Sequence, residues 1–238
     1  MKKLNQLYEG KAKKLYATDD PRVVLVSYKD DATAYNGLKR GRIPGKGVIN
    51  NQITNHMMRM LEANGIPTHY IEGISGNETM VRRVDMIPLE VVVRNIAAGS
   101  LVERLNLPEG TTLKRTVLEY NYKSDELGDP MVNESYITSF GWATPDVLRQ
   151  MSDYALKANR VMRTYLRSCG LELVDFKLEF GLLDGKVILA DEISPDTCRL
   201  WDVRTREKMD KDRFRLSMDG IAEAYREVSQ RILGEVAR

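Results

Sequence analysis

The residues best placed to do chemistry form an alternating charged series in the last third of the chain, Asp175, Lys177 and Glu179. Apolar residues separate them from Val174 to Phe180, and this period of two predicts a β-strand with one face in the core and the charges on the other. The charged face can be ordinary exposed surface. Carboxylates beside a lysine are also the groups that bind a divalent cation and offset phosphate charge.

A second acidic pair, Asp191-Glu192, follows the strand-like run Val187 to Ala190. The turn signal Asp184-Gly185 predicts that the two strands form a hairpin, which brings the two acidic clusters together. We therefore predict a metal–nucleotide site on this hairpin. A regular two-residue turn would put Glu192 on the face of Glu179. A three-residue loop, a bulge or a strand that ends before Asp191 would put Asp191 there instead, and the sequence pattern leaves these alternatives open.

The composition fits one or two domains with a sizeable core, since the 238 residues are 42% hydrophobic and 29% charged. A net charge of only +2 is too weak a bias to imply a nucleic-acid partner by itself. Cys169 and Cys198 form no CxxC motif and are expected to be free thiols in a reducing cytosol. The first residues resemble no signal peptide, and no stretch of about 18 apolar residues occurs, so we expect a cytoplasmic protein without a membrane span.

The elements around these residues are expected to begin with antiparallel β structure and to become more helical later. We expect strands at 7–9, 15–17, 23–28, 67–71, 79–84 and 89–94, loops at 30–37, 40–47 and 107–139, helices at 48–63, 97–105, 144–168, 210–214 and 218–233, and a short connector at 196–202. The link 85–88 is predicted to be a hinge between two lobes, residues 1–85 and 86–238.

Two basic segments could bind phosphate. The first hairpin has a tip from Gly10 to Lys14, where glycine would let a ligand approach and the lysines would supply charge; a solvated lysine turn is the alternative. Arg94 precedes Gly99-Ser100, where a guanidinium, a hydroxyl and backbone N–H groups could converge. An arginine that caps a neighbouring element is the alternative there.

Several segments resemble the SAICAR synthetase family, in the family's order and over nearly the whole chain. PLEVVVRNIAAGS, Pro88 to Ser100, is similar to the family pattern P-x-E-x-x-x-R-x-x-x-x-G-S, and VDFKLEFG, Val174 to Gly181, is similar to its second signature. The segments GKAKKLY, GKG, DPMVNESY and DEISPD also resemble the family. Two long motifs at the family's separation make the resemblance specific.

The resemblance implies an ATP-dependent carboxylate–amine ligase of de novo purine biosynthesis. Such an enzyme joins carboxyaminoimidazole ribonucleotide to L-aspartate and gives SAICAR, ADP and phosphate, with Mg²⁺ and an acyl phosphate intermediate. The implied fold is α+β and two-lobed, with an antiparallel-sheet N-terminal lobe, a larger mixed α/β C-terminal lobe and a kinase- or ATP-grasp-like nucleotide cleft. The family also suggests a homodimer.

The resemblance also implies individual roles. Residues expected to contact ATP are Lys11, Ala12, Lys13, Leu15 and Met86, and the expected metal ligands are Glu179 and Asp191. Arg94, Ser100 and Arg199 would hold the 5′-phosphate of the ribonucleotide, and Glu90 its ribose.

Lys177 and Asp175 are the expected catalytic residues. Lys177 would offset charge during phosphoryl transfer, and Asp175 would meet the exocyclic amine of the ribonucleotide. L-Aspartate would lie near Asn133 to Ser135 and Asp196. Some relatives have an acid where this chain has Asn36, so a third metal contact from that position would be neutral here.

Three other classes of function are weighed against this one. Another ATP-dependent ligase or small-molecule kinase would not need Arg94, Ser100 and Arg199 unless its substrate carried a phosphate. A nucleotide sensor would need affinity but no lysine at the transferred phosphoryl group, so Lys177 disfavours it. Nucleic-acid binding would require basic residues interleaved with aromatic ones, whereas here bases alternate with acids and aromatics are 7%.

Overall fold

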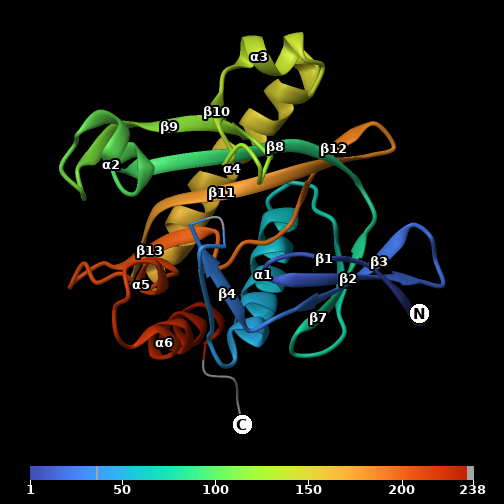
Figure 1. Cartoon of the computed structure of the whole chain (residues 1–238), viewed down its shortest axis with the longest axis horizontal. Coiled ribbons are helices and arrows are strands. Elements are labelled where there is room, and N and C mark those ends of the chain that lie inside the picture. The colour runs from blue at the N-terminus through green and yellow to red at the C-terminus, as the bar shows by residue number, and fades with distance from the viewer. Residues whose placement is uncertain (36, 235–238) are drawn as a thin grey trace.

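A computed structural model describes residues 1–35 and 37–234, and two antiparallel sheets form its frame (Figure 1). Asn36, where we expect a neutral contact in place of an acid, lies outside the described residues. The first sheet has the strand order β1 (Lys3–Glu9), β2 (Lys13–Thr18), β3 (Val23–Tyr28), β7 (Glu78–Arg82) and β6 (Tyr70–Gly73). A separate hairpin consists of β4 (Asp31–Ala34) and β5 (Lys39–Arg42).

The second sheet is built around one long strand, β11 (Leu171–Leu183). One edge of β11 pairs with β8 (Asp85–Ile96), which continues to β9 (Thr112–Tyr122) and β10 (Met131–Val132). The other edge pairs first with β13 (Cys198–Asp202) and then with β12 (Lys186–Ala190). Because neighbours flank β11 on both sides, its side chains hold fixed positions in the middle of the sheet.

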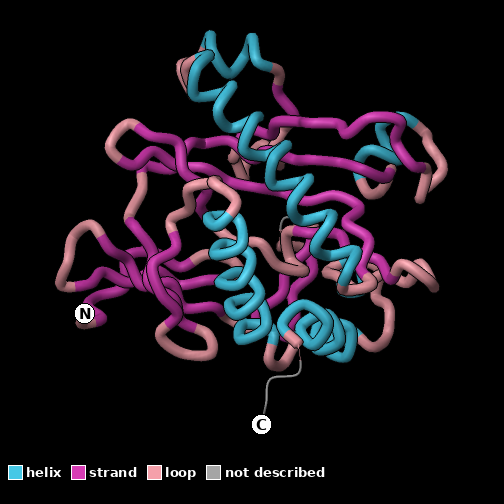
Figure 2. The backbone as a smooth tube through the Cα atoms, turned by 180° about the vertical axis from the view of Figure 1, so that it is seen from behind, coloured by secondary structure: helices cyan, strands magenta, loops and turns pink. Residues whose placement is uncertain are grey.

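Helices cover the back of the second sheet and fill the space beside the first. Figure 2 shows α4 (Pro145–Ser168) running across the back of the six-stranded sheet, with α1 (Lys46–Ala63) and α6 (Ile221–Leu233) next to it. The short helices are α2 (Ser100–Leu105), α3 (Glu134–Ser139) and α5 (Asp212–Arg215). Among the described residues, no helix has the length and apolar character needed to cross a membrane.

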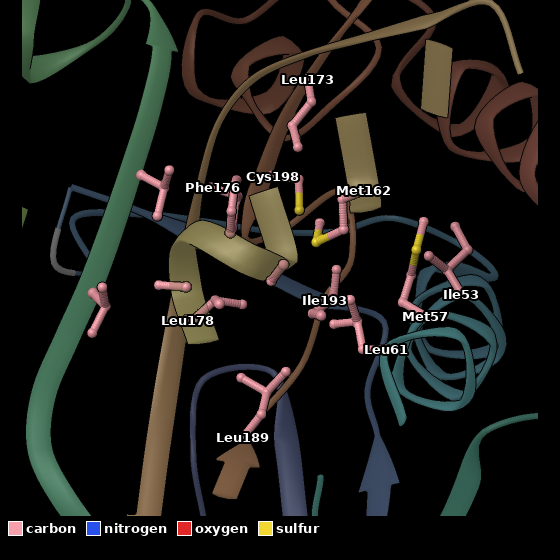
Figure 3. Packing of buried hydrophobic residues seen from close by; sticks show 14 of the residues in the cluster. Ile53, Met57, Leu61, Met162, Leu173, Phe176, Leu178, Leu189, Ile193 and Cys198 are labelled. Atoms are coloured by element: carbon pink, nitrogen blue, oxygen red, sulfur yellow. The ribbon is translucent and has the colours of Figure 1, made fainter. Parts of the chain in front are cut away.

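The main hydrophobic core joins the apolar faces of α1, α4 and α6 to the second sheet (Figure 3). Phe176, Leu178 and Phe180 of β11 lie in it, as the alternating sequence predicts. Val174 instead belongs to a smaller cluster with Ile96, Ala98 and Trp201. The pairing of β11 with β13 is irregular between Leu173 and Asp175, and such a bulge changes which residues face each side.

The α+β class is confirmed, and so is the helix that starts after Thr144, whose side chain accepts a hydrogen bond from the backbone N–H of Val147. The expected loop 107–139 is wrong over β9, β10 and α3. Over β9, pairing with β8 satisfies the backbone of a polar segment. The expected loops at 30–37 and 40–47 are wrong over β4 and β5, and the connector at 196–202 contains β13.

The link 85–88 is not a separate hinge loop, since it forms the first residues of β8. The chain passes from the first sheet to the second between Arg82 and Asp85. The division into lobes of residues 1–85 and 86–238 stays a prediction.

Candidate active site

Two adjoining cavities lie where the sheets meet. The larger, about 720 Å³, is lined mainly by charged and polar side chains, and the smaller, about 400 Å³, mainly by apolar ones. They share residues of both sheets, including Lys13, Lys123 and Glu179, and therefore form one cleft. An apolar slot that opens into a charged chamber suits a flat base at one end and phosphates at the other.

The residues expected to contact ATP all line the smaller cavity: Lys11, Ala12, Lys13, Leu15 and Met86. Val24, Val26 and Val81 of the first sheet supply further apolar surface. Lys11, Ala12 and Lys13 also border the larger cavity, so the basic hairpin tip lies at the junction of the two. The hairpin tip thus borders the cleft, and its contacts with ATP stay a prediction.

The acidic hairpin has a register that the sequence left open. The turn has two residues, Asp184-Gly185, and Glu179 lies opposite Ala190. The strand ends at Ala190, however, and Asp191 takes a left-handed backbone conformation with φ 58°. A strand that ends before Asp191 is one of the conditions under which we expect Asp191 to face Glu179. Asp191 and Glu179 both line the two cavities.

Glu192 has a different environment. Its carboxylate accepts a 2.6 Å hydrogen bond from the Ser194 hydroxyl and lies 2.9 Å from Lys13 Nζ, and it borders only the larger cavity. Asp191 also pairs with Lys13. Burial alone would raise the pKa of Asp191, but Lys13 and Lys177 hold it well below its usual range, so the carboxylate is ionised at neutral pH.

Glu179 and Asp191 fit a magnesium ion by the chemistry of their donors. Two carboxylates bordering both halves of a cleft can bind Mg²⁺ while phosphates and water complete its oxygen coordination. Across the described residues, no group of three or more His, Cys, Asp or Glu is placed to hold a metal ion. Lysines accompany Glu179, with Lys123 paired to it and Lys177 Nζ at 2.8 Å.

Lys177 lines the larger cavity and lies between two carboxylates. Its Nζ is 2.9 Å from Glu90 and 2.8 Å from Glu179. Burial would lower the pKa of this lysine, but Glu179, Asp191 and Glu90 raise it far above its ordinary value. Lys177 is therefore a permanent cation between the acidic hairpin and the arginine cluster.

The arginine cluster is a row across three strands. Asp175 of β11 pairs with Arg94 of β8 on one side and Arg199 of β13 on the other. Both guanidinium groups donate to Asp175, each at 2.9 Å, and Arg94 also donates to the Ser100 hydroxyl at 2.9 Å. Gly99 lies against Arg199 so closely that a Cβ there would be 2.4 Å from Nη2. The predicted phosphate residues are thus brought together.

Asp196, which we expect near L-aspartate, borders the larger cavity but is already paired. It accepts hydrogen bonds from Lys46 and from the Tyr225 hydroxyl, both at 2.6 Å. Burial would raise its pKa, but Lys211 and Lys46 lower it well below the usual value. Asn133 to Ser135 line neither cavity, and Asn133 accepts from the Tyr136 N–H at the start of α3.

Among the lining residues to which the sequence reasoning gave no role are four with titratable side chains: Lys123, Lys211, Arg215 and His69. Lys123 follows β9, the strand that polar composition concealed. Lys211 and Arg215 lie in or beside α5, in the segment KMDKDRFR, where charges of both signs show no periodicity. His69 is one of two histidines in the chain and lies inside the expected strand 67–71. No local pattern marks any of the four, and only the fold brings them to the cleft.

Comparison with known proteins gives a consistent result. The family described as SAICAR synthetase matches residues 6–232. A relative from Lachnoclostridium phytofermentans, phosphoribosylaminoimidazole-succinocarboxamide synthase, is 56% identical over 98% of this chain and 99% of its own. The crystal structure of the synthase from Ehrlichia chaffeensis has 44% identity and a TM-score of 0.95, covering 96% of this chain and 98% of that one.

A second solved structure bears on the cleft. It is a SAICAR synthetase in complex with ADP, with 48% identity and a TM-score of 0.93, covering 96% of this chain and 97% of that one. These matches confirm both the fold and the family expected from the sequence motifs.

Proposed function

Because the chain belongs to the SAICAR synthetase family, we propose that it catalyses the ATP-dependent ligation of carboxyaminoimidazole ribonucleotide with L-aspartate. The products are SAICAR, ADP and phosphate, and the reaction is a step of purine biosynthesis. The observation that carries the proposal is the single cleft in which an apolar slot, an acidic hairpin and an arginine cluster follow one another. The apolar slot suits the base of ATP, the acidic hairpin suits its phosphates with a metal ion, and the arginine cluster suits the phosphorylated co-substrate.

The chemistry requires activation of a carboxylate, which is a poor acyl donor. We propose that a carboxylate oxygen of the ribonucleotide attacks the γ-phosphorus of ATP, which forms an acyl phosphate and releases ADP. The amine of L-aspartate then attacks the acyl carbon, loses a proton, and inorganic phosphate leaves with the bonding electrons. Lys177 supports the first step because a fixed cation at this point offsets charge on the phosphoryl group in transit.

Magnesium is proposed as the metal, held by Glu179 and Asp191. When bound, it would neutralise phosphate charge and fix the geometry of the triphosphate. Lys13 contacts Asp191 and Lys123 contacts Glu179, and both lysines would help to hold the phosphates. Arg94, Ser100 and Arg199 would hold the 5′-phosphate, with Glu90 and Asp175 nearby for the ribose and the exocyclic amine.

The position of L-aspartate is proposed anew from the cleft. Its two carboxylates call for cations, and Lys211 and Arg215 border the larger cavity beside Asp196 and Arg199. Lys211 Nζ is 3.9 Å from Asp196, which is beyond hydrogen-bond distance, so this pair leaves the N–H donors of Lys211 available to another anion. We therefore place L-aspartate against Lys211 and Arg215 rather than near Asn133.

Two further expectations stay proposals. Homodimer formation and a cytoplasmic location come from the family resemblance, and light scattering of the purified protein tests the first. Lys177 disfavours a nucleotide sensor without turnover, because a sensor needs no cation at the transferred phosphoryl group. The paired arginines disfavour a ligase or kinase whose substrate carries no phosphate.

The deciding experiment is a turnover assay with the ribonucleotide, L-aspartate and Mg-ATP, with ADP and the succinocarboxamide both measured. We expect ADP release that depends on L-aspartate and matches product one to one. ADP release that is independent of L-aspartate, or no release, would refute the proposed ligase.

A further inference from the structure

Asp212 lies behind the arginine cluster and holds two of the guanidinium groups that border the larger cavity. Arg199 Nε donates to Asp212 Oδ2 at 2.7 Å, and Arg215 Nη1 donates to Oδ1 at 2.6 Å. Asp212 itself is 4% exposed and lines neither cavity. One buried carboxylate therefore fixes two arginines without reaching the space where substrate binds.

The backbone around Asp212 is fixed to the strand that carries Arg199. The N–H of Asp212 donates to Asp210 Oδ1 at 2.7 Å, and the N–H of Leu200 donates to Asp210 Oδ2 at 2.8 Å. Asp210 is fully buried. Because Leu200 directly follows Arg199, Asp210 connects α5 to β13 within one residue of the arginine. The carboxylate of Asp212 thus has a defined position relative to Arg199.

Charge explains why a carboxylate is needed there. Two guanidinium groups in one cavity repel each other, and a carboxylate between them offsets that repulsion. Burial would raise the pKa of Asp212, but Arg199 and Arg215 lower it, so the group is ionised at neutral pH. Each arginine uses one donor for Asp212, which orients the remaining donors of its planar fork.

We propose that Asp212 is a positioning residue that orients Arg199 toward the 5′-phosphate of the ribonucleotide and Arg215 toward L-aspartate. This inference rests on the proposed ligase function. Asp175 is different, because it lines the cavity and can touch substrate. Asp212 acts only through the two arginines, and through them it links the sites of the two anionic substrates.

The first test compares Asp212→Asn with Asp212→Glu. Asparagine keeps one acceptor for Arg199 but loses the charge and the second acceptor for Arg215. Because each arginine then loses a charged hydrogen bond that orients it, we expect the KM values for ribonucleotide and L-aspartate to rise about tenfold or more, with the KM for ATP unchanged. Glutamate keeps the charge and should recover most of the lost affinity. A glutamate variant as impaired as the asparagine variant would overturn the proposal.

Asp202→Asn is the matched control. Asp202 is also buried and pairs with an arginine, Arg231, at 2.8 Å, but it lines neither cavity. This variant should lower the melting temperature while leaving all three KM values unchanged. If Asp202→Asn shifts the substrate KM values as Asp212→Asn does, the effect is a general loss of stability and the positioning role is wrong.

A double-mutant cycle with Arg199→Ala isolates the route of action. In the Arg199→Ala background, Asp212→Asn should raise the KM for L-aspartate but add nothing to the KM for ribonucleotide. An equal further rise in the ribonucleotide KM would overturn the proposal. Wild-type protein in the same assay separates this result from failure of the ligase function, since only the latter abolishes wild-type turnover.

Discussion

Replacement of Gly99 by alanine should separate the role of Arg199 from the stability of the fold. Gly99 precedes α2 with φ 53° and ψ −136°, a conformation that non-glycine residues avoid. An added Cβ would lie 2.4 Å from Arg199 Nη2 and 2.7 Å from Cζ. The guanidinium must then move. Because Asp175 and Asp212 hold it from two sides, it cannot move without breaking those pairs.

The substitution is expected to have two separate effects, one on the free energy of folding and one on the KM for ribonucleotide. The backbone strain of an alanine at this φ and ψ is about 1–3 kcal/mol of folding free energy. The displaced Arg199 would lose the hydrogen bonds that we propose it makes to the 5′-phosphate, and a charged hydrogen bond is worth about 1.5–3 kcal/mol, or about 10- to 100-fold in KM. We expect that rise in the KM for ribonucleotide and little change in the KM for ATP.

Gly185→Ala is the matched control for strain. Gly185 also has a positive φ, 76°, but no neighbour lies within 4 Å of an added Cβ. Both variants should lose thermal stability, and only Gly99→Ala should lose ribonucleotide affinity in the steady-state assay. A folded Gly99→Ala protein with a wild-type ribonucleotide KM would refute the assignment of Arg199 to the phosphate.

Three further expectations follow from the cleft. Lys177→Ala should abolish ADP release yet leave a folded protein, as judged by circular dichroism; rates near wild type would remove Lys177 from the mechanism. Asp191→Asn should raise the Mg²⁺ concentration needed for half-maximal rate about tenfold or more, through the loss of one charged ligand; an unchanged Mg²⁺ titration would exclude Asp191 as a ligand. Burial lowers the pKa of His69 from 6.5 to about 4, so its stabilising contribution is complete above pH 6.5 and is lost as the pH falls toward 4. The loss amounts to about 3 kcal/mol below pH 4, and about 2 kcal/mol of it falls between pH 7 and 4.5. His69→Gln should remove this pH dependence from the free energy of urea unfolding; a variant that follows the wild-type pH dependence would contradict the burial argument.

The sequence could predict elements whose pattern is local. The alternation from Phe176 to Phe180 identifies β11 because one face meets the core. Thr144 and Pro145 identify the start of α4 because capping depends on a few adjacent residues. By contrast, β9 alternates little, and its partner β8 decides its conformation. A single sequence contains no signal for that pairing.

The site shows the same division. Glu179 and Asp191 lie in one continuous hairpin, so the sequence alone could predict that they are close. Which acid faces Glu179, however, depends on the residue at which β12 ends. Arg94 and Arg199 meet only because two different strands pair with the same residue of β11. The family motifs supplied that contact before the structure did. Lys211, Arg215 and Asp212 carry no such motif and needed the fold.

The regular part of β11 sets the spacing of the whole cleft. Its pairing is irregular before Asp175 and after Glu179, but between them Asp175, Lys177 and Glu179 lie on an uninterrupted stretch against β8. Each step of two residues along a strand covers about 6.6 Å, so the ends of the series are about 13 Å apart. The strand therefore fixes the distances between these three side chains. An insertion or deletion of one residue inside this stretch would reverse the faces of the strand, so the distance between its acidic ends can change only in whole steps.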